Sequence, residues 1–145
     1  GLANAVWPGR FTLIRENPSV ILDGAHNPKA AMELAASIKA CFSGKKIVYI
    51  MGMFQDKDYR QVSSITAPLA QEILTVETPG NPRALAAEEL ARAVREFHPA
   101  VTAVPSLQEA AGLALEKAGS QGVVVVFGSL SFLGEIQNFL SDKGD

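Results

Sequence analysis

The sequence predicts an α/β domain built on a doubly wound, mostly parallel sheet of about six strands, with helices on both faces. Two observations predict it. Five short β-branched runs alternate along the chain with longer segments of helical periodicity, and strands that alternate with helices pair in parallel. The runs are also apolar at almost every position, as in strands that are covered on both faces.

The central strands are predicted where the apolar runs are most continuous. They are Val20–Asp23, Ile47–Met51, Glu72–Val76, Ala100–Val104 and Val123–Phe127. Right-handed crossovers are expected to join them, because nearly all parallel connections have that hand. A further strand, Phe11–Ile14, is expected near an edge of the sheet.

Each intervening helix is recognised by one apolar stripe, and most by a capping residue. The first follows Asn27 and is expected to begin with Pro28. The second follows Asp58 and runs from Tyr59 to about Leu69. The third carries a stripe from Ala86 to Phe97. The remaining two are Leu107–Ala118, preceded by a capping box of Ser106 and Glu109, and Ser131–Leu140.

Composition indicates one globular domain over residues 1–145, of which 48% are hydrophobic. The formal net charge of −2 and the lack of a basic run argue against a nucleic-acid partner. No apolar stretch reaches the roughly 18 residues of a membrane span, and no secretory leader is recognised. The single cysteine, Cys41, fits a reducing cytoplasmic location.

The predicted topology indicates where a ligand binds. In open α/β sheets, ligands bind beyond the carboxyl ends of the strands. The four loops at those ends, which are 23–28, 52–58, 77–83 and 128–131, are rich in Gly, Pro, Asp and His residues.

The first of these loops combines an acid, a histidine and an asparagine. Asn27 is expected mainly to cap the following helix. Asp23 could simply accept hydrogen bonds from nearby backbone amides, but that role does not also explain His26. Together the two favour a ligand site, since a carboxylate holds a ribose hydroxyl or an ammonium and a histidine donates to an anionic oxygen.

The other three loops allow a structural and a functional interpretation side by side. Lys57 is either a surface lysine or a ligand group, and Arg83 is either solvated or directed into the crevice. Ser129 or Ser131 caps a helix, while backbone N–H groups at that helix start could bind an anion such as a carboxylate. The two roles are compatible at this last loop.

Near the start of the chain, Trp7 is expected to pack and Arg10 suits a phosphate, because a guanidinium matches phosphate geometry and stays charged. Several motifs are missing: a phosphate-binding P-loop, a dinucleotide-binding glycine motif, zinc-ligand spacing and a nucleophile elbow. A complete phosphate cradle or hydrolytic triad therefore cannot be assembled from this chain, and no metal ligands are assigned.

Taken in order, these motifs resemble the C-terminal domain of the folylpolyglutamate synthase/dihydrofolate synthase family, within the ATP-dependent Mur ligase superfamily. The resemblance covers nearly the whole chain. It rests on Trp7-Pro8-Gly9-Arg10-Phe11, Leu22-Asp23-Gly24-Ala25-His26-Asn27-Pro28, Gly52-Met53 with Asp56-Lys57-Asp58, and Gly128-Ser129. It implies the Rossmann-like fold of that domain.

The resemblance also implies a longer protein, whose amino-terminal P-loop ATPase domain is absent from this chain. That protein would use ATP and Mg²⁺ to phosphorylate a carboxylate of folate or dihydropteroate, which the amine of L-glutamate then attacks. The present domain alone would bind neither cofactor and would be inactive. A monomer is expected.

Roles for individual residues follow from the same resemblance. Arg10 is similar to a residue that reaches the nucleotide phosphates. Asp23 and His26 match the catalytic motif near the ribose and the incoming amine, and Asp23 would also contact the nucleotide. Lys57 and Ser129 resemble the groups that bind the two glutamate carboxylates.

Two alternatives remain open at this stage. One is a domain of another Mur-type ligase that adds a different amino acid, although the Trp7–Arg10 segment favours the folate branch. The other is a nucleotide- or anion-binding module with no catalytic partner. An upstream P-loop domain in the same polypeptide would distinguish the ligase from the module.

Overall fold

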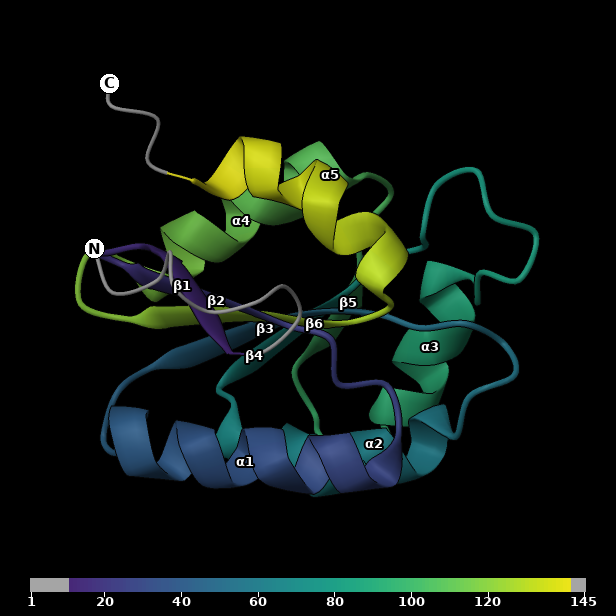
Figure 1. The fold of residues 1–145 in the computed structure, drawn as a ribbon, viewed down its shortest axis with the longest axis horizontal. Helices are drawn as coiled ribbons and strands as arrows, with labels where there is room; N and C mark the ends of the chain where they lie inside the picture. Colours follow the sequence, from purple (N-terminus) through teal and green to yellow (C-terminus); the bar gives the residue numbers. More distant parts are fainter. Residues whose placement is uncertain (1–10, 142–145) are drawn as a thin grey trace.

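In the computed structural model, residues 11–141 are described, and they form one six-stranded sheet flanked by helices (Figure 1). The strand order is β1-β2-β6-β3-β4-β5. Neighbouring strands pair in parallel except β1, which lies antiparallel to β2 at one edge. The strands are β1 (Thr12–Arg15), β2 (Ser19–Asp23), β3 (Ile47–Gly52), β4 (Glu72–Thr75), β5 (Val101–Ala103) and β6 (Val123–Gly128). The predicted mostly parallel sheet with an added edge strand is confirmed.

Five α-helices cover both faces of this sheet. Figure 1 shows α4 and α5 over one face and α1 and α2 over the other. Helix α3 packs into the same hydrophobic cluster as α1 and α2. The helices are α1 (Pro28–Phe42), α2 (Tyr59–Thr66), α3 (Ala87–Val94), α4 (Leu107–Ala118) and α5 (Leu130–Leu140).

The central strands are buried on both faces, and successive side chains enter different cores. On β3, Tyr49 and Met51 belong to the cluster under α1, α2 and α3, whereas Val48 and Ile50 belong to the cluster under α4 and α5. Every residue of β3 and β6 is buried. The continuous apolar runs that predicted these strands therefore reflect two cores that share one sheet.

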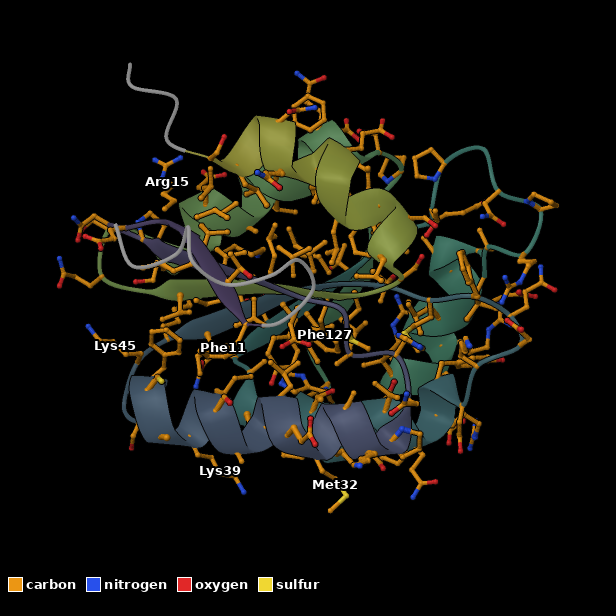
Figure 2. The ribbon with its side chains drawn as sticks, viewed as in Figure 1. Phe11, Arg15, Met32, Lys39, Lys45 and Phe127 are labelled. Carbon is orange, nitrogen blue, oxygen red and sulfur yellow. The ribbon has the colours of Figure 1, made fainter. Side chains whose placement is uncertain are left out.

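Side chains on the outer faces of the helices point to solvent. Figure 2 shows Met32 and Lys39 on the side of α1 that faces away from the sheet, and Met32 is 62% exposed. Phe127 of β6, by contrast, lies in the core, with its ring edge-to-face on Tyr49 at a centroid distance of 5.0 Å. The amphipathic stripe of α1 thus turns its apolar side to the sheet.

Local capping signals read from the sequence are confirmed. The Asn27 side chain accepts a hydrogen bond from the Ala30 amide at 2.8 Å, and Pro28 begins α1. Asp58 caps α2 and Ser106 caps α4 in the same way. These residues satisfy backbone N–H groups that a helix start leaves without intrahelical partners.

Two helices end earlier than their sequence patterns predict. Helix α2 stops at Thr66, and the predicted continuation to Leu69 is a 3₁₀ turn, η2 (Ala67–Leu69), which contains Pro68. Proline lacks the amide hydrogen that an α-helix needs and its ring crowds the preceding turn. Helix α3 ends at Val94, so Phe97, expected in its apolar stripe, lies beyond the helix and is 38% exposed.

The carboxyl ends of β3 and β6 touch through their backbones. Gly52 pairs with Gly128, and the Ser129 amide donates to the Gly52 carbonyl at 2.8 Å. Gly128 has φ +124°, and a Cβ placed there would lie 1.9 Å from the Gly52 carbonyl oxygen. Residue 128 must be a glycine, both because of its backbone angle and because of this close approach.

We predict that Gly128→Ala lowers the free energy of unfolding by roughly 2–5 kcal/mol, because backbone strain and overpacking add. Urea denaturation followed by circular dichroism would measure it. Gly134→Ala is the matched control, since this glycine lies in α5 with nothing within 4 Å of the added Cβ. The control should gain about 0.5–1 kcal/mol from helix propensity. Equal effects of the two substitutions would contradict the close-contact interpretation.

Candidate active site at the carboxyl edge of the sheet

The loops that carry the predicted site residues follow three neighbouring strands. In the sheet, β6 lies between β2 and β3. Asp23 pairs in register with Phe127, and Gly52 pairs with Gly128, so the three strands end at nearly the same level. Asp23 and Ser129 therefore lie at one edge of the sheet, which is where ligands bind in open α/β folds.

Asp23 organises the first loop through its carboxylate. Its Oδ1 accepts a hydrogen bond from the Ala25 amide at 2.8 Å, and its Oδ2 accepts one from the Phe11 amide at 3.0 Å. The backbone role that the sequence allowed for Asp23 is thus present.

His26 is held by a hydrogen bond that restricts its chemistry. Its Nδ1 lies 2.7 Å from the Gly24 carbonyl oxygen. A carbonyl only accepts, so Nδ1 carries the hydrogen. In the neutral ring Nε2 is then an acceptor, and only the cationic ring donates from both nitrogens. The expectation that His26 donates to an anionic oxygen therefore applies to its protonated form.

Ser129 directly follows Gly128, which contacts Gly52, and is only 4% exposed. Its Oγ accepts a hydrogen bond from the Ser131 amide at 3.1 Å and so caps α5. The capping role that the sequence allowed is therefore filled by Ser129. Its hydroxyl hydrogen can still be donated, and the positive end of the α5 dipole favours an anion at this point.

Lys57 lies in the turn formed by residues 53–58, here called the Lys57 turn. Its amide donates to the Phe54 carbonyl at 3.3 Å, and its carbonyl accepts from the Tyr59 amide at 2.8 Å. The residue is half-buried, and within residues 11–141 its ammonium forms no ion pair. The backbone at Lys57 is thus fixed while its charge is available.

Arg83 is exposed, as in the solvated alternative considered from the sequence, and it is also paired with a carboxylate. Its Nη2 donates to both carboxylate oxygens of Asp56, at 3.0 and 2.8 Å. The guanidinium also lies over the Phe54 ring, 4.5 Å from its centroid. Hydrogen bonding by Arg83 holds the pKa of Asp56 below its usual range, with smaller electrostatic contributions from Arg83 and Lys57. Sequence analysis missed this pair because its members stand in different loops.

Thr78 is a second group that sequence analysis did not single out. It follows β4 in the loop before α3 and is 2% exposed. Within the described part of the chain, its Oγ1 has no hydrogen-bond partner. Buried hydroxyls are nearly always paired, so Thr78 retains capacity for one more partner. No sequence pattern marks it.

Arg10, the predicted phosphate-binding residue, lies outside the described residues, as does Trp7. Over residues 11–141, no group of three or more His, Cys, Asp or Glu side chains is arranged to hold a metal ion. The same part of the chain holds no helix that is both long and apolar enough to cross a membrane.

Comparisons with known proteins identify the family of this chain. The family described as Mur ligase, glutamate ligase domain, matches residues 9–130. A dihydrofolate synthase/folylpolyglutamate synthase of Bacillus subtilis is 31% identical over 140 residues, which are 97% of this chain and 32% of that protein. The chain therefore spans about a third of the length of this curated relative.

Solved structures show the same fold. Escherichia coli FolC in complex with DHPP and ADP superposes with a TM-score of 0.84 at 29% identity, over 94% of this chain and 32% of that one. Mycobacterium tuberculosis folylpolyglutamate synthase complexed with ADP gives a TM-score of 0.84 at 26% identity, over 92% and 32% of the two chains.

The Asp56–Arg83 pair yields a prediction about pH. Because the guanidinium stabilises the carboxylate, Arg83→Ala should raise the pKa of Asp56 toward its ordinary value of about 4. Carboxyl carbon shifts in an NMR titration would measure it. In the unchanged chain the pair contributes at neutral pH and is lost as pH falls through the lowered pKa.

Glu96 provides an internal control, because Arg60 lowers its pKa in the same way. Arg83→Ala should leave the Glu96 titration unchanged, whereas Arg60→Ala should raise the pKa of Glu96. An Asp56 midpoint that does not move in Arg83→Ala would show that the pair does not form in solution.

Proposed function

This chain belongs to the Mur ligase, glutamate ligase domain family, and we propose that it is the C-terminal part of an ATP-dependent ligase that adds L-glutamate to folate or dihydropteroate. The observation that carries the proposal is the Bacillus subtilis relative, which is 31% identical across 97% of the chain. The fold supports it, because the site loops gather at the ligand-binding edge of the sheet.

The proposed substrates are ATP, L-glutamate and a folate or dihydropteroate carboxylate. A bifunctional folylpolyglutamate synthase/dihydrofolate synthase that shares the fold has been solved with Mn, AMPPNP and L-glutamate bound. We assign the P-loop and the Mg²⁺ ligands to an amino-terminal domain of the longer protein.

ATP would supply the phosphoryl group that activates the folate or dihydropteroate carboxylate, and residues of this chain would align the amine that attacks it. We assign Asp23 to a ribose hydroxyl or to the glutamate ammonium, both of which donate hydrogen bonds that a carboxylate accepts. His26, with Nδ1–H bound to the Gly24 carbonyl, presents Nε2 as an acceptor for an N–H of the amine. Holding amine and acyl phosphate in attack geometry supplies much of the rate by removing translational freedom.

The two carboxylates of glutamate need cationic or N–H and O–H donors. We assign Lys57 to one carboxylate and the Ser129 hydroxyl, at the start of α5, to the other. Arg10 is assigned to the nucleotide phosphates. A cytoplasmic location is proposed as well, because a free exposed thiol such as Cys41 is typical of a reducing compartment.

We predict different kinetic effects for the first and last loops in the full-length ligase. Asp23→Ala should lower kcat, because its partners must be aligned in the transition state. Ser129→Ala should act mainly on the KM for glutamate, with a loss in kcat/KM of roughly 10- to 100-fold, or about 1.5–3 kcal/mol. Steady-state kinetics with glutamate and ATP varied separately would measure both effects.

Two controls separate binding from folding in that experiment. Ser106→Ala removes the equivalent cap of α4, where Oγ accepts from the Glu109 amide at 3.1 Å, and each cap is worth about 0.5–2 kcal/mol of stability. Asp23→Asn removes the charge and keeps one acceptor oxygen, so it retains one of the two loop-amide hydrogen bonds that Asp23→Ala loses. If Ser129→Ala raised only the KM for ATP, the assignment of Ser129 to glutamate would be wrong.

We also predict that the 145-residue chain folds alone and catalyses nothing, because it carries two cores but no phosphate loop. Circular dichroism would report folding, and ADP release in the presence of folate and glutamate would report activity. The full-length ligase serves as the positive control. Turnover above that of a boiled sample would refute the prediction.

A further inference from the structure

The Lys57 turn is docked against the loop between β4 and α3. Phe54 and Ala84 form an antiparallel bridge. The Gln55 amide donates to the Arg83 carbonyl at 2.7 Å, and the Leu85 amide donates to the Met53 carbonyl at 2.9 Å. The Gln55 side chain also donates to the Ala84 carbonyl at 3.0 Å. The turn is therefore paired, through its first residues, with a segment about thirty residues further along.

The side chain of Arg83 adds two further contacts between these segments. It reaches back across the turn to Asp56 and lies over the Phe54 ring at the same time. Its own amide is fixed by the Asn81 side chain at 2.8 Å. A planar guanidinium serves both contacts at once, which an ammonium cannot do.

Lys57 lies between two fixed neighbours. Asp56 before it is paired with Arg83, and Asp58 after it caps α2 by accepting from the Gln61 amide at 3.2 Å. A lysine side chain has high rotamer entropy, so the position of its ammonium depends on how firmly the backbone below it is held. Because Asp56 is occupied by Arg83, it also competes less with a ligand for the Lys57 charge.

We propose that Asp56 and Arg83 are positioning residues, which hold the Lys57 turn in the geometry that binds a carboxylate of glutamate. The inference rests on the proposed function, since it needs Lys57 to be a glutamate ligand. In this proposal Arg83 acts through Asp56, because its Nη2 donates to both oxygens of that carboxylate, and not through contact with the substrate.

The effect of Asp56→Asn on the glutamate KM distinguishes positioning from direct binding. If Arg83 acts through Asp56, then Arg83→Ala and Asp56→Asn both loosen the turn and both raise the KM for glutamate. If Arg83 bound glutamate directly, Asp56→Asn would release the guanidinium and would leave that KM unchanged or lower it.

Steady-state kinetics of the full-length ligase would test this, with glutamate varied at saturating ATP. Each single variant should raise the glutamate KM by roughly 3- to 10-fold, the scale of an exposed ion pair combined with a cation–π contact. The double variant should be no worse than the larger single effect, because coupled residues are not additive. The kcat should stay within about twofold, since the chemistry is untouched.

Arg60→Ala is the matched control. Arg60 and Glu96 form another arginine–carboxylate pair between segments distant in sequence, with side chains 57% and 48% exposed against 54% and 57% for Arg83 and Asp56. It should lower the melting temperature by a similar small amount and leave the glutamate KM unchanged. If Arg60→Ala raised the glutamate KM as much as Arg83→Ala, general destabilisation would explain both increases. That result would overturn the proposal.

Lys57→Ala, measured alongside, separates the two levels of inference. If it raises the glutamate KM while Asp56→Asn and Arg83→Ala do not, the positioning role is wrong and the proposed function stands. If it leaves that KM unchanged, the positioning role falls together with the assignment of Lys57. Ser129→Ala then tests the remaining part of the glutamate site independently.

Discussion

The backbone contact between Gly52 and Gly128 sets the geometry on which the rest of the site depends. It joins the ends of β3 and β6 so closely that no Cβ fits at residue 128. From this contact the chain departs in two directions, toward the Lys57 turn on one side and into α5 through Ser129 on the other. Since β6 also pairs with β2, the same edge includes the loop of Asp23 and His26. Three loops that are distant in sequence thereby begin at the same edge of the sheet.

Hydrogen bonds between side chains and the backbone, rather than pairs of side chains, orient the residues at this edge. Asp23 accepts from two amides, His26 is bound to the Gly24 carbonyl, and Ser129 caps a helix. Each of these groups is therefore oriented before a substrate arrives. Such preorganisation lowers the entropy that binding must remove. The dual roles also mean that substitutions here change local structure and ligand binding together, so a cap-matched control is needed.

Prediction from sequence succeeded where the deciding interaction is local. Asn27 and Ser106 cap their helices because an Asn or Ser oxygen reaches an amide two or three residues ahead, and this requires no tertiary contact. It failed where periodicity continued past the physical end of an element. Pro68 cannot supply the amide that α2 would need, and Phe97 repeats the spacing of α3 although the helix ends at Val94. Whether Arg83 was solvated, bound to a ligand or paired could not be read from its neighbours in sequence.

The sequence by itself determined the fold class, the two-sided burial of the sheet and the strand ends at which polar residues gather, because apolar periodicity and turn residues act over short distances. It also carried the motifs that resemble a glutamate ligase domain. Only the tertiary structure decided the strand order, the closeness of Gly52 and Gly128, and the partner of Arg83. The physical reason is that Asp56 and Arg83 stand 27 positions apart. Two exposed charges at that separation meet only because the loops that carry them are docked by backbone pairing, and backbone pairing between loops leaves no pattern in side-chain chemistry.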